Sequence, residues 1–242
     1  MPDGLIVVIG VAGRFAHRAL AAGDGEVCAI FQKSFYVRTA AGFACIGDAR
    51  LGHGPLNALV DELPSVTIGA KLSASLAAAR PWAPPPFNGT KIDAAHARPP
   101  DEGFGGLVIG RHNALAAHAQ PALEAVDRWL VGHSLDSAAE GLIGLGPGLT
   151  PSGDDYFGGV LVALHAVRRA THAESLWRWL EPRLAARTSE LSAAHLAAAA
   201  GGEAHEALHE VLNGAPPERL DGVGHCSGWD AFAGAMAVLS NY

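Results

Sequence analysis

Cysteine is scarce in this sequence, and the few cysteines form no recognisable framework. The 242 residues include three, Cys28, Cys45 and Cys226. An odd number does not close a set of disulfides, and the spacings match no CxxC or zinc-binding motif. We therefore expect reduced thiols in a reducing compartment, which favours a cytoplasmic protein.

Positive charge and long apolar segments are lacking too. The net charge of −7, spread without long runs, argues against a nucleic acid or an anionic membrane as partner. No stretch reaches the roughly 18 apolar residues that span a bilayer. The apolar run at 5–11 has no Lys or Arg before it, so it is a poor signal peptide. With 49% hydrophobic and 17% charged residues, the composition is that of a globular protein.

The first third of the chain predicts strands. Short apolar runs punctuated by Gly and Asp are typical of strands, and they lie at 5–9, 26–30, 35–39, 42–46 and 65–68. Residues 14–22 fit a short helix, and Gly-Pro within 53–57 predicts a turn. Six prolines at 81–100 predict an extended linker or a long surface loop.

After residue 106 the pattern turns helical. Apolar spacing predicts a helix at 115–131 with Pro121 near its start, then helices at 155–169, 174–200 (two helices or one kinked helix), 205–212 and 229–240. We therefore predict an α+β fold, with a β-rich region at 1–98 and a helical region at 104–242.

A glycine-rich loop at 144–155 is the strongest local feature, with the sequence Gly-Leu-Gly-Pro-Gly-Leu-Thr-Pro-Ser-Gly-Asp-Asp. Such a rigid, irregular backbone before a helix start exposes N–H groups that suit an anion. The spacing is neither that of a Walker loop nor that of a dinucleotide fingerprint. A structural loop with ordinary helix caps is the alternative. The candidate ligand-binding residues here are Gly146, Gly148, Thr150, Ser152 and Gly153.

Asp154 and Asp155 complicate an anion site, because two carboxylates repel an anion. Three interpretations stay open. One Asp caps the helix while the other accepts an N–H from a neutral amide or urea-like group; the pair holds Mg²⁺, which bridges to a ligand oxygen; or both are structural.

A short internal sequence repeat links this loop to the C-terminal helix. The pattern Ser-Gly-x-Asp-x-Phe-x-Gly occurs at 152–159 and again at 227–234. It predicts the same local structure at both places, a capped helix start followed by a helix face of small residues. Because Gly inside a helix is unfavourable, Gly158, Gly159 and Gly234 predict two helices that cross closely.

The second loop, at 224–230, adds further candidates. Ser227 and Gly228 are expected to bind the ligand, and Asp230 to orient His225 or cap the helix. His225 acts as general acid or base, or it is a hydrogen-bonded structural histidine. Cys226 is a poor candidate nucleophile, since adjacent Cys and His side chains rarely face each other.

Three other groups of residues have weaker signals. Lys33 supplies positive charge to a site or is a plain surface lysine. His205 and His209 fit the His-Glu-x-x-His pattern. Because their helix is short and polar, we expect a solvated face and no metal site there, and the same for His195.

These motifs resemble a known family. The segments 144–155 and 224–230 are similar to the two signature loops of the domain-of-unknown-function 2877 family, and residues 188–194 and 27–34 are similar to its middle motif and its N-terminal strand. One branch of that family is a subunit of oxamate carbamoyltransferase, an enzyme of allantoin degradation. It makes oxamate and carbamoyl phosphate from oxalurate and phosphate with two other subunits, one related to acyl-CoA synthetases.

The resemblance implies a carbamoyltransferase-like subunit that binds a small anionic ligand with amide N–H groups, together with partner subunits. The candidate catalytic residues are Asp154, Asp155, His225 and Asp230. Two hypotheses from other classes remain: a non-catalytic binding or assembly protein, and a stand-alone metal-dependent hydrolase.

Overall fold

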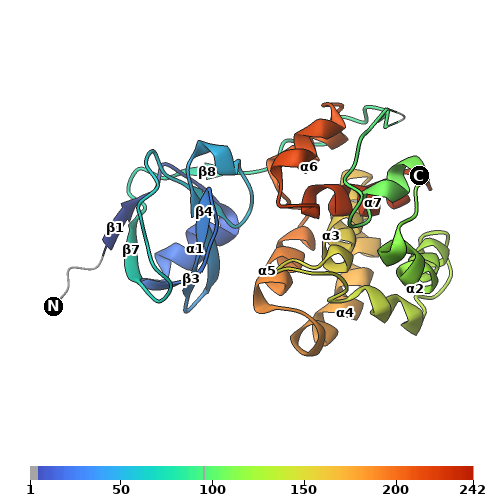
Figure 1. Cartoon of the computed structure of the whole chain (residues 1–242), viewed down its shortest axis with the longest axis horizontal. Coiled ribbons are helices and arrows are strands. Elements are labelled where there is room, and N and C mark those ends of the chain that lie inside the picture. Colours follow the sequence, from blue (N-terminus) through green and yellow to red (C-terminus); the bar gives the residue numbers. More distant parts are fainter. Residues whose placement is uncertain (1–4, 95, 242) are drawn as a thin grey trace. The chain divides into compact units, whose positions relative to one another are not determined.

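The computed structural model describes residues 5–94 and 96–241. The chain forms two compact units, Met1–Pro84 and Pro85–Tyr242. The first is β-rich and the second is helical (Figure 1), which confirms the predicted α+β class. That regions 1–98 and 104–242 are the domains stays a prediction. None of the described helices is long and apolar enough to cross a membrane.

The N-terminal unit is a curled sheet with the strand order β1-β7-β3-β4-β5-β6-β2-β8. Although β1 and β2 stand far apart in that order, only Ile9 and Gly10 separate them in the chain. Ile9 N donates to the carbonyl of Ser75 (3.0 Å), and Gly10 N to that of Leu59 (2.8 Å). The sheet therefore curls until its two ends meet. Its strands are β1 Leu5–Val8, β2 Val11–Gly13, β3 Gly25–Ile30, β4 Ser34–Thr39, β5 Gly42–Gly47, β6 Asn57–Leu59, β7 Lys71–Ser75 and β8 Arg80–Trp82.

One short helix, α1 (Arg14–Ala21), packs against this sheet. Its buried face consists of Ala16, Ala19 and Leu20, which share one core with inward-facing strand residues such as Val27 and Val37. Small alanines let the helix approach the strands closely, so this unit fills its own core.

The sequence misplaces parts of this sheet. The predicted strand at 65–68 is wrong: Ile68 is 62% exposed, and the chain joins the sheet only after it, as β7 between β1 and β3. Asn57, assigned to a turn, begins β6. Pro81 lies in β8, the last strand in the order. Proline is tolerated in such a strand, because its missing N–H is not needed to pair with a further strand. The other predicted strands are confirmed as β1, β3, β4 and β5.

The helical unit is arranged around α3, which contacts α4, α5 and α7 (Figure 1). Residues 156–164 of α3 are apolar on almost every side, as expected of a helix buried all round. The α-helices are α2 Ala114–Leu130, α3 Ser152–Ala166, α4 Ala170–Arg187, α5 Glu190–Ala199, α6 Glu206–Leu212 and α7 Ser227–Leu239, and the 3₁₀ helices of this unit are η2 Gly105–Ile109, η3 Ser137–Leu142 and η4 Pro217–Gly222.

Two helix predictions are settled by local hydrogen bonds. The segment 174–200 is two helices, because Oγ of Ser189 accepts the N–H of Ser192 (2.9 Å) and starts α5. The placement of Pro121 near a helix start is wrong, since α2 begins at Ala114 and Pro121 lies inside it. Pro121 lies on an exposed side of α2, so water can bond the backbone carbonyl that proline leaves unpaired.

The proline-rich segment that follows β8 is bound to the helical unit. Asn88 N donates to Oδ1 of Asn213 (2.8 Å), and Nδ2 of Asn213 donates to the carbonyl of Pro86 (3.3 Å). Arg111 holds the end of the segment through the carbonyl of Pro100 (2.8 Å). These contacts make it an ordered surface loop.

Candidate functional site

Helices α3 and α7 begin in the same way. Each follows a 3₁₀ helix and a glycine loop, and each starts with Ser-Gly. The N–H of Gly153 donates to the carbonyl of Leu145 (2.9 Å), and the N–H of Gly228 to that of Val223 (3.1 Å). The sequence repeat is therefore accompanied by a repeat of the backbone structure.

Close packing requires the glycine that follows each serine. A Cβ at Gly153 would lie 1.9 Å from the carbonyl oxygen of Leu142, and one at Gly228 would lie 2.7 Å from that of Leu220. Leu142 ends η3 and Leu220 lies in η4. The same element of each repeat therefore covers the same side of its helix start.

The two helices cross at glycines, as the sequence repeat predicts. A Cβ at Gly159 would lie 1.7 Å from the carbonyl oxygen of Ala231, and one at Gly234 would lie 1.9 Å from that of Tyr156. The contacts are reciprocal, because Gly159 and Tyr156 occupy the repeat positions of Gly234 and Ala231. An approximate twofold axis therefore relates α3 to α7.

Around this axis the two helix starts meet. Oγ1 of Thr150, just before α3, lies 3.1 Å from Oγ of Ser227, the first residue of α7. Asp155 and Asp230 occupy the same position in the two repeats, and we call them the carboxyl pair. In each of them Oδ2 is buried and has no hydrogen-bond partner.

Burial raises the pKa of Asp155 well above its usual value. The negative charges of Asp230 and Asp154 raise it further, while the hydroxyls of Ser227 and Thr150 act in the opposite direction. A carboxyl in such surroundings retains its proton at a pH where exposed carboxyls are ionised.

The second member of the pair, Asp230, is only 1% exposed, and burial raises its pKa to about 6. Hydrogen bonds from the Phe104 N–H and from Ser152 partly offset this increase. Each serine thus acts on the aspartate of the other repeat: Ser227 acts on Asp155, and Ser152 acts on Asp230.

Asp154 has a different environment from its neighbour. Its Oδ1 accepts the N–H of Gly144 (2.8 Å), and its Oδ2 accepts the hydroxyls of Thr188 and Ser192, the latter at 2.6 Å. Asp154 is 2% exposed, so these bonds satisfy a buried carboxylate and tie the glycine loop to the segment between α4 and α5. Of the three interpretations of the two aspartates, the structural one fits Asp154.

The predicted side-chain caps do not form. The N-cap residues are Pro151 for α3 and Cys226 for α7, and neither makes a side-chain cap bond. Ser152 and Ser227 lie one position later, inside the first turn, where their hydroxyls reach toward the other helix. Because Gly153 and Gly228 donate within the chain, side chains are better placed than these amides to meet a ligand.

Residues of the second loop lie near the surface. Nε2 of His225 pairs with Oε2 of Glu102 at 2.6 Å, with both side chains more than 70% exposed. The predicted orientation of His225 by Asp230 is wrong, because Oδ1 of Asp230 accepts the N–H of Phe104. Burial and the nearby Asp230 charge raise the pKa of Cys226 to about 12, which disfavours a thiolate nucleophile.

The other histidines do not form a solvated face. His209 is 7% exposed, and its Nε2 accepts the N–H of Ala204 (3.1 Å). Burial lowers the pKa of both His195 and His209 to about 4, which keeps their rings neutral. Within residues 5–94 and 96–241, no group of three or more His, Cys, Asp or Glu could hold a metal ion.

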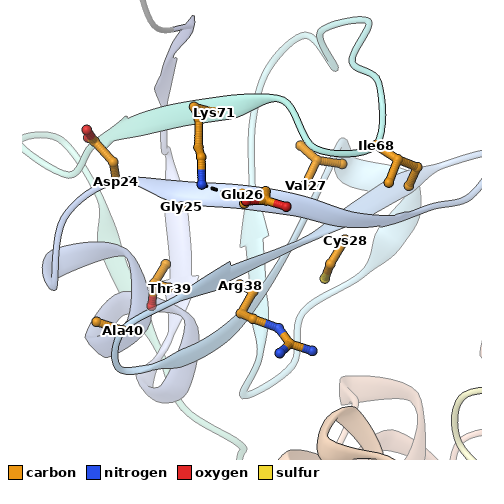
Figure 2. A pocket seen from close by; sticks show the side chains of 10 residues that line it. All are labelled: Asp24, Gly25, Glu26, Val27, Cys28, Arg38, Thr39, Ala40, Ile68 and Lys71. Carbon is orange, nitrogen blue, oxygen red and sulfur yellow. Dashed lines mark hydrogen bonds and ion pairs between the residues drawn. The ribbon is translucent and has the colours of Figure 1, made fainter.

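A separate hollow of about 560 Å³ lies in the N-terminal unit over β3, β4 and β7 (Figure 2). Its charged side chains already interact: Nζ of Lys71 lies 2.6 Å from Oε2 of Glu26 and lowers the pKa of that carboxyl. Lys33 is exposed between β3 and β4 of this unit. Its contribution to a site in the helical unit stays a prediction.

The two repeats mark out the part of the chain that a known family shares. They run from Leu142, which covers Gly153, to Leu239, which ends α7. Residues 142–239 match the family model of the oxamate carbamoyltransferase subunit AllH. The AllH match confirms the resemblance over this segment and supports a carbamoyltransferase-related subunit. Comparison with curated proteins and with solved structures gives no match.

The structure gives a role to residues that the sequence indicated only as part of the motif at 188–194 or did not indicate at all. Thr188 and Ser192 bind Asp154, and Phe104, outside the AllH segment, binds Asp230. A longer comparison of the repeats would have indicated more of the site, since Leu-x-Gly-Leu/Val-Gly occurs at 142–146 and 220–224. Contacts with Phe104 depend on tertiary packing and leave no such pattern.

The raised pKa of Asp230 makes stability depend on pH. As pH rises from 4 to about 6, the unfolded state releases a proton that the folded state retains, so this contribution to the free energy of unfolding is lost. We expect Asp230→Asn to be more stable than the wild type at pH 8 by ~2–3 kcal/mol and equally stable below pH 4. Urea unfolding from pH 4 to 8 measures this difference, and a constant difference would contradict it.

Proposed function

We propose that this chain is a subunit of an oxamate-type carbamoyltransferase and binds a small, anionic, amide-containing ligand where α3 and α7 begin. The AllH match supports the first half of the proposal. The carboxyl pair carries the second, because it leaves two buried oxygens without partners at the meeting point of two helix starts. Buried polar groups are nearly always hydrogen-bonded, so these oxygens indicate a partner from outside the chain.

The side chains around the pair suit such a ligand. The carboxyl oxygens accept amide N–H groups, and the hydroxyls of Thr150, Ser152 and Ser227 donate to anionic oxygens. The proton that Asp155 retains reduces the repulsion between the carboxyl pair and an anion. In the loop before α3, Gly146 and Gly148 have φ of 114° and 94°, values that favour glycine and hold the loop in its irregular path.

A binding experiment tests this site. Calorimetric titration of the full chain with oxamate and with carbamoyl phosphate should give saturable heat for at least one ligand. Ser227→Ala should weaken that ligand at least ~10-fold, which corresponds to about 1.4 kcal/mol, because a hydroxyl at the site is lost. The control is Ser137→Ala, which removes an exposed serine in η3. The ligand site is contradicted by no heat with either compound, or by equal affinities in the two variants.

Partner subunits belong to the same proposal, since the matched family is named as a subunit. The proton-transfer role of His225 and the charge contributed by Lys33 stay predictions, as does a cytoplasmic location.

A further inference from the structure

The carboxyl pair offers a ligand two carboxyl oxygens from equivalent positions. Oδ2 of Asp155 and Oδ2 of Asp230 are both buried, and both lack hydrogen-bond partners. Their other surroundings follow the repeat as well, with Ser227 next to Asp155 and Ser152 next to Asp230. A ligand on the approximate twofold axis therefore meets one aspartate and one serine from each helix, while Thr150 acts on Asp155 and the Phe104 N–H acts on Asp230.

The pair resists double ionisation. Oδ2 of each carboxyl is out of water, and the charge of Asp230 disfavours ionisation of Asp155. Like charges that interact in a buried site raise one apparent pKa, which favours a pair that titrates as a unit with one proton between its two members.

The titratable groups that face the pair do not reverse this. Asp154, on α3, adds negative charge and is itself occupied by Gly144, Thr188 and Ser192. The Cys226 thiol, just before α7, has a raised pKa and stays protonated. From the start of η2 and the residue before it, the backbone N–H groups of Gly105 and Phe104 act on Asp230 and lower its pKa. The neighbouring groups thus do not remove the repulsion between the two carboxyls, and a proton shared by the pair does.

Resting on the proposed function, we propose that Asp155 and Asp230 hold one proton between them and bind the N–C=O group of the ligand. The protonated carboxyl donates to the carbonyl oxygen, and the ionised carboxylate accepts from the N–H. No bond in the ligand is made or broken in this step.

This arrangement selects amides among ligands of similar shape. A primary amide presents a donor and an acceptor side by side, which complement a pair that holds one proton. A ketone or a carboxylate at that position presents acceptors only and leaves the ionised carboxylate unpaired, at a large cost in a buried site. The ligand class is therefore amides and carbamoyl compounds that also carry an anionic group.

The protonation of the pair can be measured without a ligand. In the full chain, ¹³C NMR of Asp side chains against pH should show Asp155 and Asp230 titrating in two linked steps. Asp230→Asn should lower the apparent pKa of Asp155, because a neighbouring negative charge is removed. Independent titration of the two carboxyls, each unaffected by substitution of the other, overturns the shared proton.

Ligand recognition is tested with oxamate and with pyruvate, which has a methyl group in place of the amide nitrogen. Oxamate keeps one charge between pH 5.5 and 9.5, so any pH dependence of its affinity comes from the protein. In the wild type we expect its affinity to fall at least ~10-fold once the shared proton is lost, and pyruvate to bind at least ~10-fold more weakly than oxamate at pH 6.

Asn at either position fixes one N–H donor beside one carboxylate, so in Asp155→Asn and in Asp230→Asn the alkaline loss should shrink to under ~2-fold. Asp127→Asn is the matched control, since Asp127 on α2 also has a pKa raised by burial; it should keep the wild-type pH profile. Oxamate binding that is independent of pH, or that keeps its pH profile in both Asn variants, overturns this inference and leaves the proposed function standing. No oxamate binding at any pH overturns both.

Discussion

Substitution of Gly159 by Ala is expected to lower the free energy of unfolding by ~3 kcal/mol or more, or to prevent folding. The added Cβ would lie 1.7 Å from the carbonyl oxygen of Ala231, which is backbone and cannot rotate away. Helices α3 and α7 would have to separate, and overpacking of this kind commonly costs about 1–3 kcal/mol even where side chains can adjust. Urea unfolding followed by circular dichroism measures the loss.

The residue before it is the control. A Cβ at Gly158 would meet only the Cβ of Ala199, at 3.8 Å, an ordinary contact. Gly158→Ala should therefore stabilise the protein by about 0.5–1 kcal/mol through its helix propensity. The sequence predicts close packing at Gly158 as well as at Gly159, and for Gly158 that prediction is wrong. Equal effects of the two substitutions would contradict the helix crossing.

Asp154→Ala is expected to lower the free energy of unfolding by ~3 kcal/mol, because three donors lose a buried charged acceptor. They are the Gly144 N–H and the hydroxyls of Thr188 and Ser192. The loss should appear in thermal and urea unfolding and should be similar with and without ligand. Such a result would separate Asp154 from the carboxyl pair.

Asp136→Ala provides the comparison. Asp136 precedes η3, and its exposed Oδ1 accepts one N–H, from Ala138 (2.8 Å). The same oxygen accepts the Ser137 hydroxyl at 3.4 Å, and removing these two exposed bonds should cost about 0.5–1 kcal/mol. If Asp154→Ala costs no more than Asp136→Ala, its three bonds do not stabilise the fold.

The sequence could indicate the site but could not distinguish the roles of its two adjacent aspartates. Asp154 and Asp155 are adjacent and chemically identical, so any pattern treats them alike. In the helix they point about 100° apart. This rotation takes Asp154 to the segment between α4 and α5 and Asp155 to the twofold axis. Only the packing around α3 decides which one is satisfied within the chain.

Prediction of the fold was limited in the same way. Local runs identify β3, β4 and β5, whose antiparallel pairing needs only short turns. They do not identify β7, whose partners β1 and β3 lie more than forty residues away in the chain. The burial of His209 was also missed, because its helix is polar in sequence but lies against the core.

The two repeats differ in one respect that matters for selectivity. Between the equivalent glycines of the repeat, Gly146 and Gly224, and the serine that starts each helix, the first copy has five residues, 147–151, and the second has two, 225–226. The carboxyl pair is not symmetric either, because the pKa of Asp155 is raised well above its usual value while that of Asp230 is raised to about 6. The two ends of a guest molecule therefore meet different acidities as well as loops of different length, and together these differences fix which way round the molecule enters.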